Sequence, residues 1–190
     1  MAIRMDEVTR ALALLGEPAL DALQLIEAGA LAQQYYPLFD PSSSTLVTGL
    51  AGADLKAIQA TLLRAYPTGH EATLLGETRR AITLDQLAES TAANAFYLPP
   101  LPHPGSYSAL QNVAARLRAP DGCPWDRELT WDKLRPFLLE EAHELLAALD
   151  AEEPGKVLEE EGDLLLQIAL QAQISTVNGA YRFPDVVHRI

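Results

Sequence analysis

The sequence predicts a mixed fold, in which an N-terminal α/β half-domain is followed by an all-α helical bundle. Short strand-like segments alternate with helical ones in the first half of the chain. A stretch rich in proline and glycine, residues 98–106, then interrupts the pattern. Beyond this stretch the long apolar segments have helical spacing, so the second half is expected to contain helices only.

The N-terminal region, residues 1–97, is expected to form two helices and three strands. The helices follow from apolar residues at helical spacing, and the strands from leucine and β-branched residues between turn-forming ones. The predicted helices span residues 6–15 and 54–66, and the predicted strands span residues 44–48, 71–75 and 80–84.

Residues 98–106 have the composition of a stiff linker, because four of these nine residues are proline. Proline-rich segments adopt extended, semi-rigid conformations and end regular structure on either side. The chain is therefore expected to divide into residues 1–97 and residues 107–190.

The C-terminal region is expected to contain a first helix at 107–118, a Gly-Cys-Pro-Trp loop at 122–125, and two longer helices at 134–149 and 157–174. Pro136 must either kink the first long helix or lie in its first turn. Glu153-Pro154-Gly155 is expected to make the turn, and Pro154 suits the opening of the second long helix. The long helices then form a tight antiparallel hairpin.

Two acidic clusters lie within these two helices. Helical geometry places Glu141 inside the apolar arc of the first helix, Glu144 on its edge, and Glu140 on the outer side. The second helix is apolar nearly all round, so Glu160 and Asp163 are predicted to point into the protein. Buried carboxylates are costly unless a cation meets them, and a hard divalent ion is the natural partner.

Several polar and aromatic residues nearby have alternative interpretations. Lys156, one turn before Glu160, could equally contact a phosphate or form an exposed ion pair with that residue. Trp125 could stack on a base, although a tryptophan near a helix start more often packs against the protein. His143 is expected to be solvated. Ordinary solvated charges are expected at Glu152, Glu153, Glu159 and Glu161.

Three motifs together resemble the MazG family of nucleoside triphosphate pyrophosphohydrolases over roughly residues 108–190. They are Asp121-Gly122-Cys123-Pro124-Trp125-Asp126, Leu139-Glu140-Glu141-Ala142-His143-Glu144-Leu145-Leu146 and Glu160-Glu161-Gly162-Asp163-Leu164-Leu165-Leu166-Gln167. The resemblance implies a MazG-type all-α bundle that forms a homodimer. It also implies Mg²⁺, with Mn²⁺ as a second suitable ion, bound by Glu141, Glu144, Glu160 and Asp163.

The function implied by this resemblance is metal-dependent hydrolysis of nucleoside triphosphates to the monophosphate and pyrophosphate. Glu140 and Glu141 are the candidate catalytic residues, and Glu140 would orient the attacking water. Lys156 and Trp125 are the candidate substrate-binding residues. The alternative is a catalytically weak metal-binding or dimerisation module that acts as a scaffold. Proteins of the family continue into a basic fourth helix, so we expect residues 107–190 to be truncated in that helix.

The N-terminal region resembles the C-terminal half of the tetrapyrrole methylase family. The similar segments are Asp21-Ala22-Leu23-Gln24-Leu25, Thr83-Leu84-Asp85-Gln86-Leu87 and Tyr97-Leu98-Pro99-Pro100-Leu101. Methylase and MazG domains are fused in this order in what is known of the two families. The glycine-rich loops that bind S-adenosylmethionine are absent, so we expect no methyl transfer.

Composition excludes several other classes of protein. A formal net charge of −12 is unfavourable for binding a nucleic acid polymer. The single cysteine, Cys123, excludes an internal disulfide framework and indicates a reducing compartment. No apolar run is long enough to span a bilayer, and no signal-peptide pattern is visible, so a cytoplasmic protein without membrane contact is expected.

Overall fold

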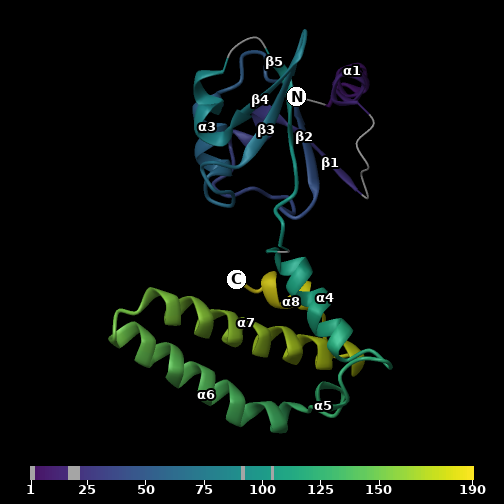
Figure 1. Cartoon of the computed structure of the whole chain (residues 1–190). Coiled ribbons are helices and arrows are strands. Elements are labelled where there is room, and N and C mark those ends of the chain that lie inside the picture. Colours follow the sequence, from purple (N-terminus) through teal and green to yellow (C-terminus); the bar gives the residue numbers. More distant parts are fainter. Residues whose placement is uncertain (1–2, 17–21, 91–92, 104) are drawn as a thin grey trace. The chain divides into compact units, whose positions relative to one another are not determined.

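The computed structural model describes residues 3–16, 22–90, 93–103 and 105–190. It divides into two compact units, Met1–Ser106 and Tyr107–Ile190. The first unit combines a β-sheet with helices, and the second is helical (Figure 1). The predicted mixed class is therefore confirmed. Within the described part of the chain, no helix has the length and apolar character needed to cross a membrane.

A five-stranded sheet with the order β1-β2-β5-β3-β4 forms the centre of the first unit. Only the β1–β2 pair is parallel. The sequence predicted β2, β3 and β4 to within one residue at each end but missed β1 and the central strand β5. The strands are β1 Leu23–Glu27, β2 Ser44–Thr48, β3 Glu71–Gly76, β4 Arg79–Thr83 and β5 Ala93–Leu98.

The helical segments of this unit are α1 Met5–Leu15, α2 Ala28–Leu31, α3 Leu55–Leu62 and the 3₁₀ helix η1 Leu84–Glu89. The helix predicted at 6–15 is confirmed. The one predicted at 54–66 is shorter, because Asp54 is its N-cap and accepts a hydrogen bond from the amide of Ala57. After Leu62 the chain tightens into turns that reach Tyr66.

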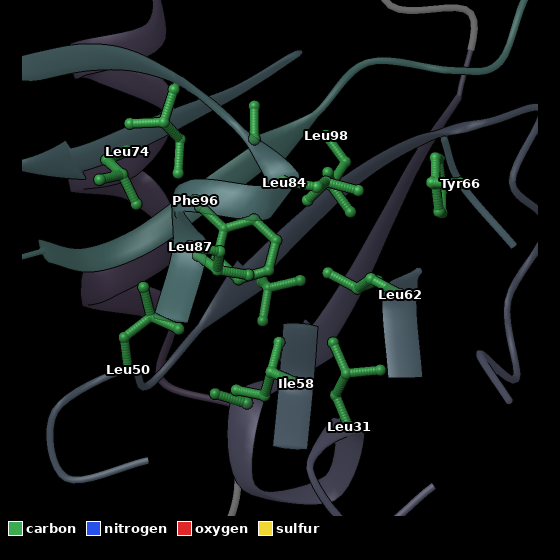
Figure 2. Packing of buried hydrophobic residues seen from close by; sticks show 14 residues of the cluster. Leu31, Leu50, Ile58, Leu62, Tyr66, Leu74, Leu84, Leu87, Phe96 and Leu98 are labelled. Carbon is green, nitrogen blue, oxygen red and sulfur yellow. The ribbon is translucent and has the colours of Figure 1, made fainter. Parts of the chain in front are cut away.

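Alternating residues of the strands send side chains to opposite faces of the sheet, and each face is covered. Helix α1 packs on one face, where it contacts Leu46, Leu75 and Ala95. Their neighbours in sequence, Val47, Leu74 and Phe96, belong to the larger cluster on the other face. Figure 2 shows this cluster, with Phe96 among side chains from α3 and η1, including Ile58, Leu62, Leu84 and Leu87.

The segment predicted as a linker belongs in part to this unit, so that prediction is wrong for residues 98–101. Leu98 is the last residue of β5, is fully buried and pairs with Thr45. The ring of His70 donates to the carbonyl of Pro99 at 2.9 Å, and the amide of Leu101 donates to the carbonyl of Pro41. Backbone pairing therefore holds the first prolines of the segment, although composition alone resembles a linker. Pro104 and Asp21, which also entered the sequence predictions, lie outside the described residues.

The second unit contains α4 Tyr107–Leu117, α5 Pro124–Arg127, α6 Trp131–Asp150, α7 Pro154–Val177 and α8 Phe183–Val187. Helices α6 and α7 run antiparallel, side by side, as the predicted hairpin (Figure 1). Helix α4 packs against α7, and a cluster that includes Ala114, Leu134 and Leu170 joins the three helices.

The details of the hairpin differ slightly from the prediction. Pro154 is the first residue of α7, as predicted, but the turn lies at Ala151–Glu152, ahead of the predicted 153–155. Glu152 takes a left-handed conformation there, with a φ of 54°. Pro136 lies inside α6, beyond its first turn, because the helix begins after the N-cap Thr130.

The Gly-Cys-Pro-Trp segment closes the end of α4, and part of it is the short helix α5 rather than the predicted loop. The amide of Cys123 donates to the carbonyl of Leu117 at 2.8 Å. Arg118 donates to the carbonyls of Asp126 and Leu129. At Gly122 a β-carbon would collide with the backbone carbonyls of α4. The motif therefore has a structural role, since it fixes the path from α4 to α6.

We expect Gly122→Ala to destabilise the protein by about 1–3 kcal/mol, the usual cost of forcing an extra carbon into a packed site. The free energy of unfolding, measured by denaturant titration with circular dichroism, checks this. Gly155→Ala is the matched control, because a β-carbon there would meet no atom within 4 Å. Equal stability of the two variants would contradict the close packing at Gly122.

Candidate metal centre

The α6–α7 hairpin brings three of the four predicted ligands together. One carboxylate oxygen from each of Glu141, Glu144 and Glu160 lies within 4.8 Å of the other two. Two oxygens that bind the same Mg²⁺ or Ca²⁺ at about 2.0–2.6 Å can be at most about 5 Å apart, so the spacing suits a shared ion. Carboxylate oxygens are also the ligands that hard divalent cations prefer.

Burial differs strongly among the four predicted ligands. Glu160 is only 5% exposed, Glu141 is half-buried and Glu144 is exposed. Asp163 is also exposed, so the prediction that it points into the protein is wrong for the single chain. The reason is that α7 is covered by neighbouring helices on part of its circumference only, whereas its apolar sequence suggested burial on all sides.

The carboxylates repel one another. The pKa of Glu141 is raised above its ordinary value, first by partial burial and then by the negative charges around it, which are those of Asp163, Glu144, Glu160 and Glu140. The charges of Asp163 and Glu140 therefore act on the centre, although neither oxygen belongs to the group of three. A divalent cation would relieve this repulsion, and the residues present fit such an ion.

Lys156 forms an ion pair beside this group. Its Nζ lies 3.5 Å from Oε1 of Glu160 and 3.0 Å from Oε2 of Glu159. The pKa of Lys156 is raised, chiefly by the hydrogen bond to Glu159. The ion pair with Glu160 that the sequence suggested is present, and the contact of Lys156 with a phosphate stays a prediction. The sequence missed the contact with Glu159, although the i, i+3 spacing of these residues could have indicated it.

Trp125 is 56% exposed, and its ring meets that of Phe137 edge-on at a centroid distance of 5.5 Å. Phe137 precedes Glu141 by about one turn of α6. Trp131 also packs, since its Nε1 donates to the carbonyl of Gln171. Both tryptophans have the expected packing contacts, and Trp125 keeps an accessible ring.

His143 and Glu140 are exposed on α6. The histidine is thus solvated, as predicted, and it is not one of the three residues whose oxygens converge. The structure assigns no direct ligand role to either residue.

The segment that forms the hairpin matches a known domain. Residues 129–190 match the family model of the MazG nucleotide pyrophosphohydrolase domain. This match contains α6, α7 and all of the predicted ligands. The chain therefore contains a MazG domain, and the resemblance seen in its motifs is confirmed for this part.

Among curated proteins, MazG of Thermotoga maritima, named a nucleoside triphosphate pyrophosphohydrolase/pyrophosphatase, is 39% identical over 44% of this chain and 33% of its own length. The nucleoside triphosphate pyrophosphohydrolase of Escherichia coli K12 is 40% identical over 40% of this chain and 30% of its own length. YabN of Bacillus subtilis, an uncharacterized protein, is 33% identical over 70% of this chain and 30% of its own length. The chain thus spans about a third of each of these relatives.

The repulsion at Glu141 leads to a prediction for the metal-free protein. Because the folded state raises the pKa of this carboxyl above 4.5, stability should fall as the pH rises from about 4.5 through the raised pKa. Glu141→Gln should lose this part of the pH dependence and unfold at a higher temperature than the unaltered chain at neutral pH. Added Mg²⁺ should reverse the order, because it stabilises only a protein that binds it.

Thermal unfolding followed by circular dichroism, with EDTA or with Mg²⁺, measures both effects. Glu161→Gln is the control, since Glu161 is an exposed carboxylate of α7 that is not one of the three residues whose oxygens converge. An equal response of the two variants to pH and Mg²⁺ would rule out the special environment of Glu141.

Proposed function

We propose that the unit Tyr107–Ile190 hydrolyses nucleoside triphosphates to the monophosphate and pyrophosphate with the help of Mg²⁺. The main support is the convergence of Glu141, Glu144 and Glu160 within the segment that matches the MazG domain. The names of the relatives from T. maritima and E. coli support an enzyme of this type.

In this proposal Glu141, Glu144 and Glu160 hold the ion, and Asp163 is the fourth ligand. Asp163 lies one turn after Glu160 and already acts on Glu141 through its charge, so a change of rotamer could bring it to the ion. A bound Mg²⁺ would neutralise charge on the phosphate oxygens and make an attacking water more acidic.

The remaining roles belong to residues around the carboxylates. Glu140 is exposed beside Glu141, where its carboxylate can accept a proton from a water and orient it. Lys156 can donate to a phosphate oxygen, and the accessible ring of Trp125 can stack on the base. The choice of the α-phosphorus as the point of attack comes from the family resemblance.

We also propose that the unit forms a homodimer through α6 and α7. Each helix has three exposed aliphatic residues at intervals of seven and three, which is the spacing of a helix–helix seam. They are Leu139, Leu146 and Leu149 on α6, and Leu158, Leu165 and Ile168 on α7. Exposed apolar stripes of this kind mark protein contacts, and a second copy would cover them.

The N-terminal unit is proposed to be a partial methylase-like domain. The match to YabN covers 70% of the chain, more than the second unit contains, so it must extend into the first.

A second candidate function is a metal-binding or dimerisation scaffold with little catalysis. The observation in its favour is that Lys156, the cation recorded against the converging carboxylates among the described residues, is already paired with Glu159 and Glu160. A triphosphate needs cationic partners beyond one metal ion during bond cleavage.

Pyrophosphate release, measured over the common NTPs and dNTPs with Mg²⁺, separates the two functions. Turnover on the order of 1 per second or more would support the enzyme. Glu141→Gln and Asp163→Asn should then each reduce turnover by about 100-fold or more, as the loss of an electrostatic partner at a reaction centre does. Glu161→Gln should retain the activity. No release of pyrophosphate from any nucleotide would favour the scaffold.

The dimer is tested by Leu158→Glu. Leu158 is 74% exposed, so the substitution leaves the fold of a single chain intact but places a charge in the proposed seam. Light scattering after gel filtration should show a dimer for the unaltered chain and a monomer for the variant. Leu38→Glu is the control, since Leu38 is equally exposed but belongs to the first unit. A dimer that survives Leu158→Glu would place the contact elsewhere.

A further inference from the structure

We propose that Lys156 is a counter-ion that competes with the divalent cation for Glu160. Glu159 is then a positioning residue, which keeps Lys156 beside the metal centre when Glu160 binds the ion. This inference rests on the metal centre of the proposed function. It adds a regulation of that centre by two residues that neither the domain match nor the names of the relatives assign.

Glu160 lies in an environment that favours a nearby cation. Its side chain is 6% exposed and is thus the most buried carboxylate of the group, so its charge most needs a partner. Within the described residues, the cation recorded against it is Lys156, at 3.5 Å. In the metal-free protein, this ammonium group therefore supplies part of the charge compensation that a divalent ion would supply.

Glu159 lies beside the ammonium group of Lys156. Its Oε2 lies 3.0 Å from the ammonium of Lys156, closer than the oxygen of Glu160. Glu159 is exposed, and its oxygens are not among the three that converge on the centre. It can therefore hold Lys156 without using a metal ligand. An ammonium group has three donors, so Lys156 can bond to Glu159 and to a phosphate oxygen at once.

These two contacts link the donors of Lys156 to the metal centre. If a bound ion held Glu160, Lys156 would lose one partner and keep Glu159, and one more of its three donors would become available to a phosphate. In the metal-free protein this donor is engaged by Glu160, so Lys156 has fewer donors to offer a nucleotide.

Binding of Mn²⁺ without nucleotide tests the competition, because the readout does not depend on turnover. Lys156→Met should bind Mn²⁺ more tightly than the unaltered chain, by roughly 1.5-fold to fivefold, the size expected for a partly exposed ion pair. The affinity is measured from the free Mn²⁺ signal in electron paramagnetic resonance. Lys133→Met is the control, since Lys133 is an exposed lysine of the same unit whose Nζ donates to the carbonyl of Glu128 instead.

Glu159→Gln tests the positioning role through a double-mutant cycle. Introduced by itself, Glu159→Gln should leave Lys156 paired with Glu160 and no longer with Glu159, and it should weaken Mn²⁺ binding by a few-fold. In the Lys156→Met background the effect should be clearly smaller, because only the general loss of one negative charge remains. Circular dichroism of each variant checks that the helices are intact.

The outcomes separate this inference from the function on which it rests. If Mn²⁺ does not bind to the unaltered chain, the proposed metal centre and the inference both fall. If Mn²⁺ binds, but Lys156→Met resembles Lys133→Met, the competition is wrong and the metal centre stands. An equal effect of Glu159→Gln in both backgrounds overturns the positioning role.

Discussion

The close approach of like charges between α6 and α7 is the constraint on which the second unit depends. Three carboxylates converge within 4.8 Å, and one of them is buried, so their repulsion opposes the packing of the hairpin. The apolar contacts around Leu134, Leu170 and Ile174 hold the helices together against this repulsion. Such an arrangement costs stability without a cation, which is typical of a centre shaped for binding.

The same hairpin explains the surface of the unit. Its cluster of buried side chains is small, whereas seven large aliphatic residues on α6 and α7 remain exposed. A helical unit of this size has little interior, and an added copy would increase the apolar area removed from water. In the proposed function, the same two helices therefore carry both the carboxylates that would bind the ion and the apolar stripes that would face a second copy.

The first unit is packed differently from the second. Its sheet is covered on both faces, and its larger cluster consists of leucine, isoleucine and aromatic side chains that are almost completely buried (Figure 2). Its long-range strand pairs bring β5 between β2 and β3, which precede it in sequence. The sheet and its two apolar clusters thus form the core of this unit, and the match to YabN extends into it.

The sequence by itself determined the longer helices, the hairpin and the identity of the acidic residues. These features depend on local spacing, and Glu141, Glu144 and Glu160 could be chosen from helical geometry before any fold was known. Strands β2, β3 and β4 were also visible, because their composition is strongly β-forming.

Only the tertiary structure decided which residues are covered. Strand β5 begins with Ala93 and Asn94 and runs into prolines, so nothing local marks it as the centre of a sheet. Asp163 and the exposed leucines look buried in the sequence, but α7 has too few neighbours to cover every face. The bond from Glu159 to Lys156 required side-chain positions. Burial and ion pairing depend on contacts between distant segments, and a local pattern does not contain them.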